Sequence, residues 1–152
     1  MQYRVGIYKD KRETLLIIPK VYDENKILRD LNKPVFLNVP YDFNMIGRTI
    51  RKCFEVCAKE LFQHSKDAVK VYEIATGVRS FAKFTKERDY VTCLMDAENG
   101  YKFSPWQRYP DGSYRPIDNS VVNFEVGLEA EDEKIGEIIM NAFALLNISK
   151  TV

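Results

Sequence analysis

Two short segments with the same pattern constrain what this chain can fold into. Residues 46–54 and 135–143 lie 89 positions apart and share an isoleucine, a glycine, a second isoleucine and a phenylalanine at matching places. The apolar residues recur at every fourth position, which places them on one stripe of a helix. A glycine inside a helix costs about 1 kcal/mol relative to alanine. Its use at one register in both segments therefore indicates a close approach to another element.

We interpret the two segments as a strand–helix repeat, because β-like runs at residues 34–39 and 121–126 precede them. The alternative is chance, since protein cores favour isoleucine and phenylalanine. Both interpretations predict main helices at residues 46–64 and 132–147. We expect Gly47 and Gly136 to lie where each helix meets a sheet, and Arg51 to lie on the exposed face of the first helix.

The remaining segments predict strands. Residues 3–9 and 14–19 have a hairpin pattern, residues 89–95 and 100–103 have another, and a last strand is expected at residues 119–126. Residues 20–33 are charged and predict a surface loop. The predicted fold is a single α+β domain over residues 1–152, with a largely antiparallel sheet and the two main helices packed on it.

Composition and charge narrow the possible functions. The net charge of +1 gives no overall bias towards nucleic acid. Residues 1–91 carry 18 basic and 12 acidic side chains, however, whereas residues 92–152 carry 5 and 10. No apolar run is long enough to cross a membrane, and the N-terminus lacks a secretory pattern, so we expect a cytoplasmic protein.

The sequence contains few candidates for a metal site or a catalytic centre. Cys53, Cys57 and His64 fall on one helical face, but His64 lies about 10 Å beyond Cys57 along the helix axis, which is too far to share one ion. We expect these cysteines, and Cys93, to be core thiols. With one histidine and no phosphate-binding or nucleophile motif, we expect no catalytic residue, no cofactor and no metal.

Two groups of residues are candidates for contacts with a protein partner. Aromatic and arginine side chains, which are enriched at interface hot spots, gather on the late hairpin. The simpler interpretation is that half of these aromatic residues pack the sheet. An acidic run opens the second helix, where negative charge suits the helix N-terminus. The candidate residues are Trp106, Arg108, Tyr109, Tyr114, Glu129, Glu131, Asp132 and Glu133.

Residues 34–146 resemble the CdiI immunity proteins of bacterial contact-dependent growth inhibition. The similar features are two strand–helix units whose helices begin with a hydrophobic residue and glycine, a serine–aromatic–lysine–phenylalanine segment, and a strand pair that runs into a Ser-Pro dipeptide. In this chain they are Ile46-Gly47, Ile135-Gly136, the segment from Gly77 to Phe84, and Ser104-Pro105.

This resemblance implies a cytosolic antitoxin. Such a protein binds the C-terminal toxin domain delivered by a neighbouring cell, often a nuclease, and blocks its active site. Its partner is a protein, and it does not bind nucleic acid directly. The residues alone leave two alternatives open: a nucleic-acid-binding module that uses a basic face from residues 1–91, and a hydrolase that works without histidine.

Overall fold

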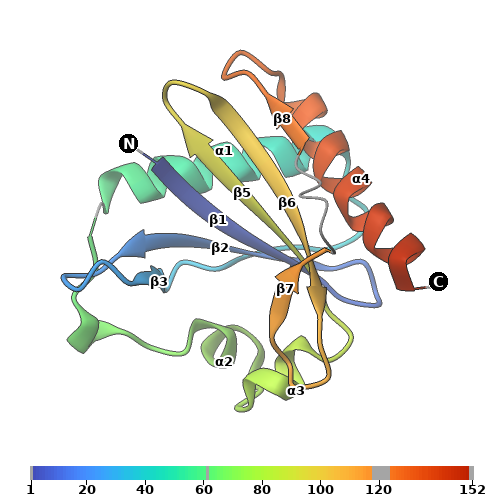
Figure 1. Ribbon diagram of the computed structural model, residues 1–152. Coiled ribbons are helices and arrows are strands. Elements are labelled where there is room, and N and C mark those ends of the chain that lie inside the picture. Colours follow the sequence, from blue (N-terminus) through green and yellow to red (C-terminus); the bar gives the residue numbers. More distant parts are fainter. Residues whose placement is uncertain (1, 61, 118–123, 151–152) are drawn as a thin grey trace.

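The computed structural model describes residues 2–60, 62–117 and 124–150. It shows a curled antiparallel sheet of eight strands with helices on both faces (Figure 1). The strands are β1 (Gln2–Lys9), β2 (Leu15–Tyr22), β3 (Leu28–Asp30), β4 (Val35–Leu37), β5 (Asp89–Asp96), β6 (Gly100–Arg108), β7 (Tyr114–Pro116) and β8 (Phe124–Val126). The helices are α1 (Phe43–Lys59), α2 (Val71–Thr76), α3 (Phe81–Thr85) and α4 (Asp132–Lys150), with a short 3₁₀ helix at Ser65–Asp67. The predicted α+β fold is confirmed.

The order of elements is the same in the two halves of the chain. Four strands, β1–β4, precede α1, and four strands, β5–β8, precede α4. β1 pairs with β5 at the centre, and each half adds a long strand beside it and two short strands at the edge. β4 and β8 start 89 residues apart, and Gly47 and Gly136 are separated by the same distance in sequence. The predicted strand–helix repeat is thus part of a five-element repeat, and α2 and α3 lie in the connection between the halves.

The two repeat helices contact each other at their glycines. A Cβ at Gly47 would lie 2.6 Å from the carbonyl carbon of Asp132, and a Cβ at Gly136 would lie 2.7 Å from that of Phe43. Real Cβ atoms do not come so close to backbone, so each position requires glycine. The predicted close approach is confirmed, but its predicted neighbour is wrong. α1 and α4 lie on the same face of the sheet (Figure 1). Each glycine therefore meets the first turn of the other helix.

Each face of the sheet has its own core. α1 and α4 cover the first face, where the predicted helical stripes are buried together with alternate residues of β1, β2, β5 and β6. α2 and α3 cover part of the second face, with Phe84 and Val71 packed on Tyr8, Leu16 and Tyr90. Alternation along each strand divides its side chains between the two faces.

Residues 20–33 form a strand pair rather than the predicted surface loop. β2 continues to Tyr22, and β3 pairs back on it with Asp30 opposite Lys20. β2 accommodates Pro19 because its outer side pairs with β4 up to Ile17 and with β3 from Lys20 onwards. The proline, which has no N–H to donate, falls between the two partners.

The helix ends differ in part from the predicted ones. α1 starts at Phe43, after Asp42 caps it by accepting a hydrogen bond from the Met45 N–H at 2.8 Å. It ends at Lys59 instead of residue 64, because the chain turns to bond with β2, with the Gln63 N–H 3.1 Å from a carbonyl oxygen at its end. α4 begins at residue 132 as predicted and continues past residue 147. Of the predicted last strand, residues 119–123 lie outside the described residues.

Candidate partner-binding surfaces

Two of the aromatic candidates help to fix the late hairpin on the second core. Trp106 Nε1 donates a hydrogen bond to Thr92 Oγ1 at 2.9 Å, and the Tyr114 hydroxyl donates to the carbonyl oxygen of Arg88 at 2.8 Å. The Tyr114 ring lies 4.9 Å from that of Tyr90, and burial raises the pKa of Tyr114. Both candidates are half-buried, so packing accounts for much of their role, as the simpler interpretation held.

Of the other two hairpin candidates, Arg108 holds the hairpin against α3, and Tyr109 contacts Arg115 within the hairpin. Arg108 donates to Thr85 Oγ1 at 3.0 Å and to the carbonyl oxygen of Ala82 at 2.9 Å. The guanidinium of Arg115 lies 4.2 Å from the centre of the Tyr109 ring, a distance typical of a cation–π contact. All four hairpin candidates are half-buried, so each keeps some surface that a partner can reach.

The acidic candidates lie where the chain passes from β8 into α4, a surface we call the acidic turn (residues 128–133). Glu129, Glu131 and Glu133 are exposed, and within the described ranges none of them forms an ion pair. Leu128 beside them is 40 % exposed. Asp132 differs, because its carboxylate accepts a hydrogen bond from Arg51 Nε at 2.5 Å. The acidic turn therefore exposes three carboxylates that have no ion pair among the described residues, together with the apolar side chain of Leu128.

The prediction that Arg51 lies on an exposed outer face is wrong. Its guanidinium is half-buried, bonds to Asp132 and to the carbonyl oxygen of Ala130, and lies 3.2 Å from the Tyr101 hydroxyl. Helical periodicity placed it outward, but α4 packs beside α1 and covers that side. Arg51 thus joins the start of α4 to α1 and to the sheet.

We expect Arg51→Ala to lower the free energy of unfolding by about 1–3 kcal/mol, because it leaves a half-buried carboxylate and a carbonyl oxygen without their donor. Chemical denaturation would measure the loss. Arg51→Lys should recover only part of it, since an ammonium cannot reproduce the planar fork. Lys52→Ala, on the exposed face of the same helix, is the control and should change stability by less than about 0.5 kcal/mol. Equal midpoints for the two alanine variants would contradict this role.

The structure does not bring the two groups of candidates together. Trp106 and Tyr114 pack on the second face of the sheet, whereas the acidic turn leads into the helix on the first face. They also lie at opposite ends of β6, because Gly100 at its start contacts Gly127 while Trp106 is near its end. A partner that binds the acidic turn need not touch the aromatic hairpin.

A row of charged side chains crosses the part of the second face beyond the second core. Residues directly opposite each other on neighbouring strands project to the same face, and the strand registers align five charged residues and one leucine in one row. In order across the sheet they are Asp30, Lys20, Arg4, Leu94, Lys102 and Glu125. We call this set the charged row. Its two ends are acidic and its middle is basic.

The charged row was not predicted from sequence, because it depends on the pairing of six strands. Lys20 Nζ lies 2.6 Å from Asp30 Oδ1, whereas within the described residues no carboxylate pairs with Arg4 or Lys102. A cavity of about 210 Å³ lies beside Arg4 and Lys20 and is also lined by Tyr22 and Leu94. If the second strand had been predicted to extend through Lys20, the hairpin register would have placed Lys20 opposite Arg4. That pair of basic residues was the one part of the row that the sequence could have indicated.

A second basic surface lies at the tip of the β1–β2 hairpin, where it meets α3. This basic cleft has a volume of about 420 Å³. Its acidic groups are already engaged, since Asp10 accepts the N–H groups of Arg12 and Thr14 and Glu87 binds Lys11. The lining residues are Asp10, Lys11, Arg12, Lys83, Lys86, Glu87 and Arg88. The basic excess of residues 1–91 is thus partly gathered in one cleft.

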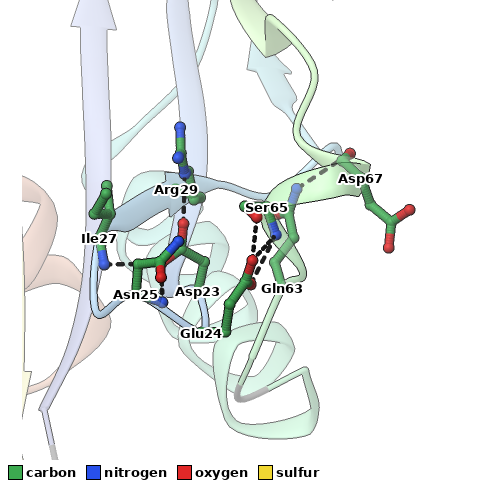
Figure 2. Close-up of polar contacts among 8 residues, drawn as sticks. All are labelled: Asp23, Glu24, Asn25, Ile27, Arg29, Gln63, Ser65 and Asp67. Carbon is green, nitrogen blue, oxygen red and sulfur yellow. Dashed lines mark hydrogen bonds and ion pairs between the residues drawn. The ribbon is translucent and has the colours of Figure 1, made fainter.

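A polar network anchors the connection that carries α2 and α3 (Figure 2). The buried carboxylate of Asp23 accepts hydrogen bonds from the N–H groups of Asn25 and Ile27 and from Arg29 Nε, at 2.8–2.9 Å. The neighbouring Glu24 carboxylate binds the N–H and hydroxyl of Ser65. Burial alone would raise the pKa of Asp23, but its three donors outweigh burial and lower it. The network therefore ties the β2–β3 turn to the connection.

We expect Asp23→Asn to lower the melting temperature at neutral pH, because an amide pairs less well with Arg29 and the two N–H groups. The ionised carboxylate, with a lowered folded-state pKa, stabilises the fold above its unfolded pKa of about 3.9, and this contribution is lost as pH falls through the folded value. The difference in melting temperature between parent and variant should therefore shrink between pH 7 and pH 3. A difference independent of pH would contradict the assignment.

The three cysteines are buried in the cores, as predicted. Burial raises the pKa of Cys53 to about 12 and that of Cys57 to about 11, and it raises the pKa of Cys93 as well. Each thiol therefore stays protonated at neutral pH and is a poor nucleophile. In the described part of the chain, no group of three or more His, Cys, Asp and Glu side chains is placed to hold a metal ion.

Among the described residues, no helix combines the length and the apolar character needed to span a membrane.

Comparison with known proteins gives a fold but no sequence family. No protein-family model and no curated protein matches this chain. A chain of the CdiA-CT/CdiI toxin and immunity complex from Yersinia pseudotuberculosis shares the fold with a TM-score of 0.70 and 6% identity, over 95% of this chain and 97% of that one. A protein of unknown function from Neisseria meningitidis has a TM-score of 0.64 and 16% identity, over 95% of both chains. At these identities the likeness supports a CdiI-like fold alone.

Proposed function

We propose that this protein is an immunity protein that neutralises a cognate toxin domain of a contact-dependent growth inhibition system. The observation that carries the proposal is the likeness, over almost the full length, to a chain from a toxin and immunity complex. The resemblance of residues 34–146 to the CdiI group points the same way. The protein would act in the cytosol, by binding and without turnover.

The toxin that suits this chain best is a nuclease. A nuclease must attract a polyanion, so its cleft is basic, and the acidic turn offers complementary charge. Glu129, Glu131 and Glu133 are exposed and unpaired within the described residues, and Leu128 supplies apolar contact area. Occupation of the toxin's cleft by this surface would block substrate entry directly.

The test is co-expression with the toxin domain encoded beside this gene. We expect the protein to restore growth and to co-purify with the toxin as a complex. Inhibition of the toxin in vitro should become complete at a one-to-one ratio, because a binding protein acts stoichiometrically, whereas an enzyme that inactivates the toxin would act below that ratio. Failure to restore growth would contradict the immunity role.

The basic cleft is the observation that favours a nucleic-acid-binding module instead. Its cations could contact phosphates, and such binding would weaken steeply with salt. None of its lining residues is aromatic, however, so it lacks the stacking surface that single-stranded nucleic acid uses. We therefore favour the immunity role, and a gel-shift assay with single-stranded RNA would measure the alternative.

A further inference from the structure

We propose that the charged row binds a short acidic segment of a protein partner. Arg4 lies directly opposite Lys20 on one face of an antiparallel pair, an arrangement that destabilises a sheet. Asp30 offsets the charge of Lys20, but within the described residues no carboxylate pairs with Arg4. Stability of the fold therefore does not account for Arg4, whereas an anionic ligand would. The inference rests on the proposed function for the identity of the partner, the toxin, but not for the chemistry of the site.

Two cations of the row are available to a ligand. Lys20 is already bound to Asp30, which leaves Arg4 on β1 and Lys102 on β6 without an ion pair among the described residues. Leu94 on β5 lies between them. Neighbouring strands are about 4.8 Å apart, so the two cations rise from backbones about 10 Å apart. This spacing fits two carboxylates that flank an apolar side chain.

The ends of the row favour a protein segment over nucleic acid. The basic part extends only from β2 to β6, about 14 Å at the usual strand spacing. Beyond it lie the carboxylates of Asp30 and Glu125, which would repel the next phosphates of a nucleic acid strand. A peptide can place its carboxylates only where the cations are, and the guanidinium of Arg4 can bind one of them through two parallel hydrogen bonds.

The shape of the surface also suits an extended peptide. The cavity of about 210 Å³ beside Arg4 and Lys20 is lined by Tyr22, Leu28 and Leu94, and it reaches inward to Val21 and Cys57 of a small core cluster. An apolar side chain of the ligand therefore has a recess to enter. The second core, with α2 and α3 above it, fills the other end of this face. An acidic segment with alternating apolar residues would place carboxylates on the row and an apolar side chain in the recess.

The experiment uses a fluorescein-labelled peptide of alternating glutamate and leucine, Glu-Leu-Glu-Leu-Glu, titrated with the full-length protein. We expect the double variant Arg4→Gln, Lys102→Gln to weaken its binding at least about fivefold, the effect of losing roughly one kcal/mol. The matched control, Lys83→Gln with Lys86→Gln in the basic cleft, removes the same charge and should leave the affinity unchanged. Arg4→Gln alone should keep or raise the melting temperature, because it removes a like-charge contact.

Three outcomes would overturn the inference. Equal weakening by the two double variants would show that the peptide senses net charge and not the row. Displacement of the peptide by a single-stranded DNA of equal charge, at equal concentration, would favour nucleic acid. A lower melting temperature for Arg4→Gln would make Arg4 a structural residue. Because the toxin takes no part in these measurements, their failure leaves the immunity role standing, and failed growth rescue leaves the peptide result valid.

Discussion

Gly47→Ala and Gly136→Ala are each expected to lower the free energy of unfolding by about 1–3 kcal/mol, the usual cost of overpacking a tight contact. The direction is diagnostic, because the same change at an ordinary helical position stabilises by about 1 kcal/mol. At both glycines the new methyl group would meet the backbone of the other helix, which cannot move aside as a side chain can. Leucine at either position should cost more. Urea denaturation, with the midpoint and slope fitted separately, measures the effect.

The control and the double variant test the reciprocal contact. Arg48→Ala alters the exposed neighbour of Gly47 and should stay within about 0.5 kcal/mol of the parent. The double variant of both glycines should lose less than the sum of the single losses, because the first methyl group already separates the helices. Strict additivity would show that the two sites do not share one contact. Parental stability in either single variant would refute the close approach itself.

Periodicity predicted much of what lies within each element. The stripes through Ile46 and Ile135, the acidic start of the second helix and the antiparallel sheet follow from spacing along the chain, and the structure confirms them. The glycine pattern also indicated a close approach correctly. The element that each glycine contacts was mispredicted as the sheet. The position of a glycine in a helix indicates that another backbone comes close, but it does not indicate whether that backbone belongs to a strand or to a helix.

Features that depend on several elements at once could not be predicted. Arg51 has the helical phase of an exposed residue, and only the placement of α4 buries it. The strand predicted at residues 14–19 stopped at Pro19, yet β2 continues to Tyr22 because a change of partner strand accommodates the proline. The charged row needs the register of six strands to be known. In each case the sequence specifies the residue, while the tertiary arrangement specifies its neighbours.

The two groups of candidate binding residues also differ in how well the sequence predicted them. The acidic turn is contiguous in sequence, so its charge could be recognised directly, and the structure adds that three of its carboxylates are unpaired within the described residues. The aromatic candidates were chosen by residue type. Trp106 hydrogen-bonds to Thr92 on β5, and Tyr114 hydrogen-bonds to the backbone of Arg88 just before β5. Residue type alone therefore does not distinguish side chains that pack the fold from side chains that bind a partner.

Reversal of Glu129, Glu131 and Glu133 to lysine is expected to slow association with the toxin domain by about ten- to a hundredfold, because charged clefts steer their partners over that range. The dissociation rate should change less, since rim charges act mainly on encounter. Growth protection should fall in parallel. The fold should survive, because these side chains are exposed, although lysines at a helix N-terminus cost about 0.3–1 kcal/mol each.

A control variant is needed to distinguish the effect of the acidic turn from the effect of total net charge on the association rate. Reversal of Glu13, Glu55 and Asp67, which are exposed on other surfaces, changes the total charge by the same amount and should slow association far less. Raising the salt concentration should slow the parent towards the rate of the acidic-turn variant, since the Debye length falls to about 3 Å at 1 M ionic strength. If the acidic-turn variant associates like the parent at every salt concentration, the carboxylates serve only to begin α4, and the toxin must meet another surface.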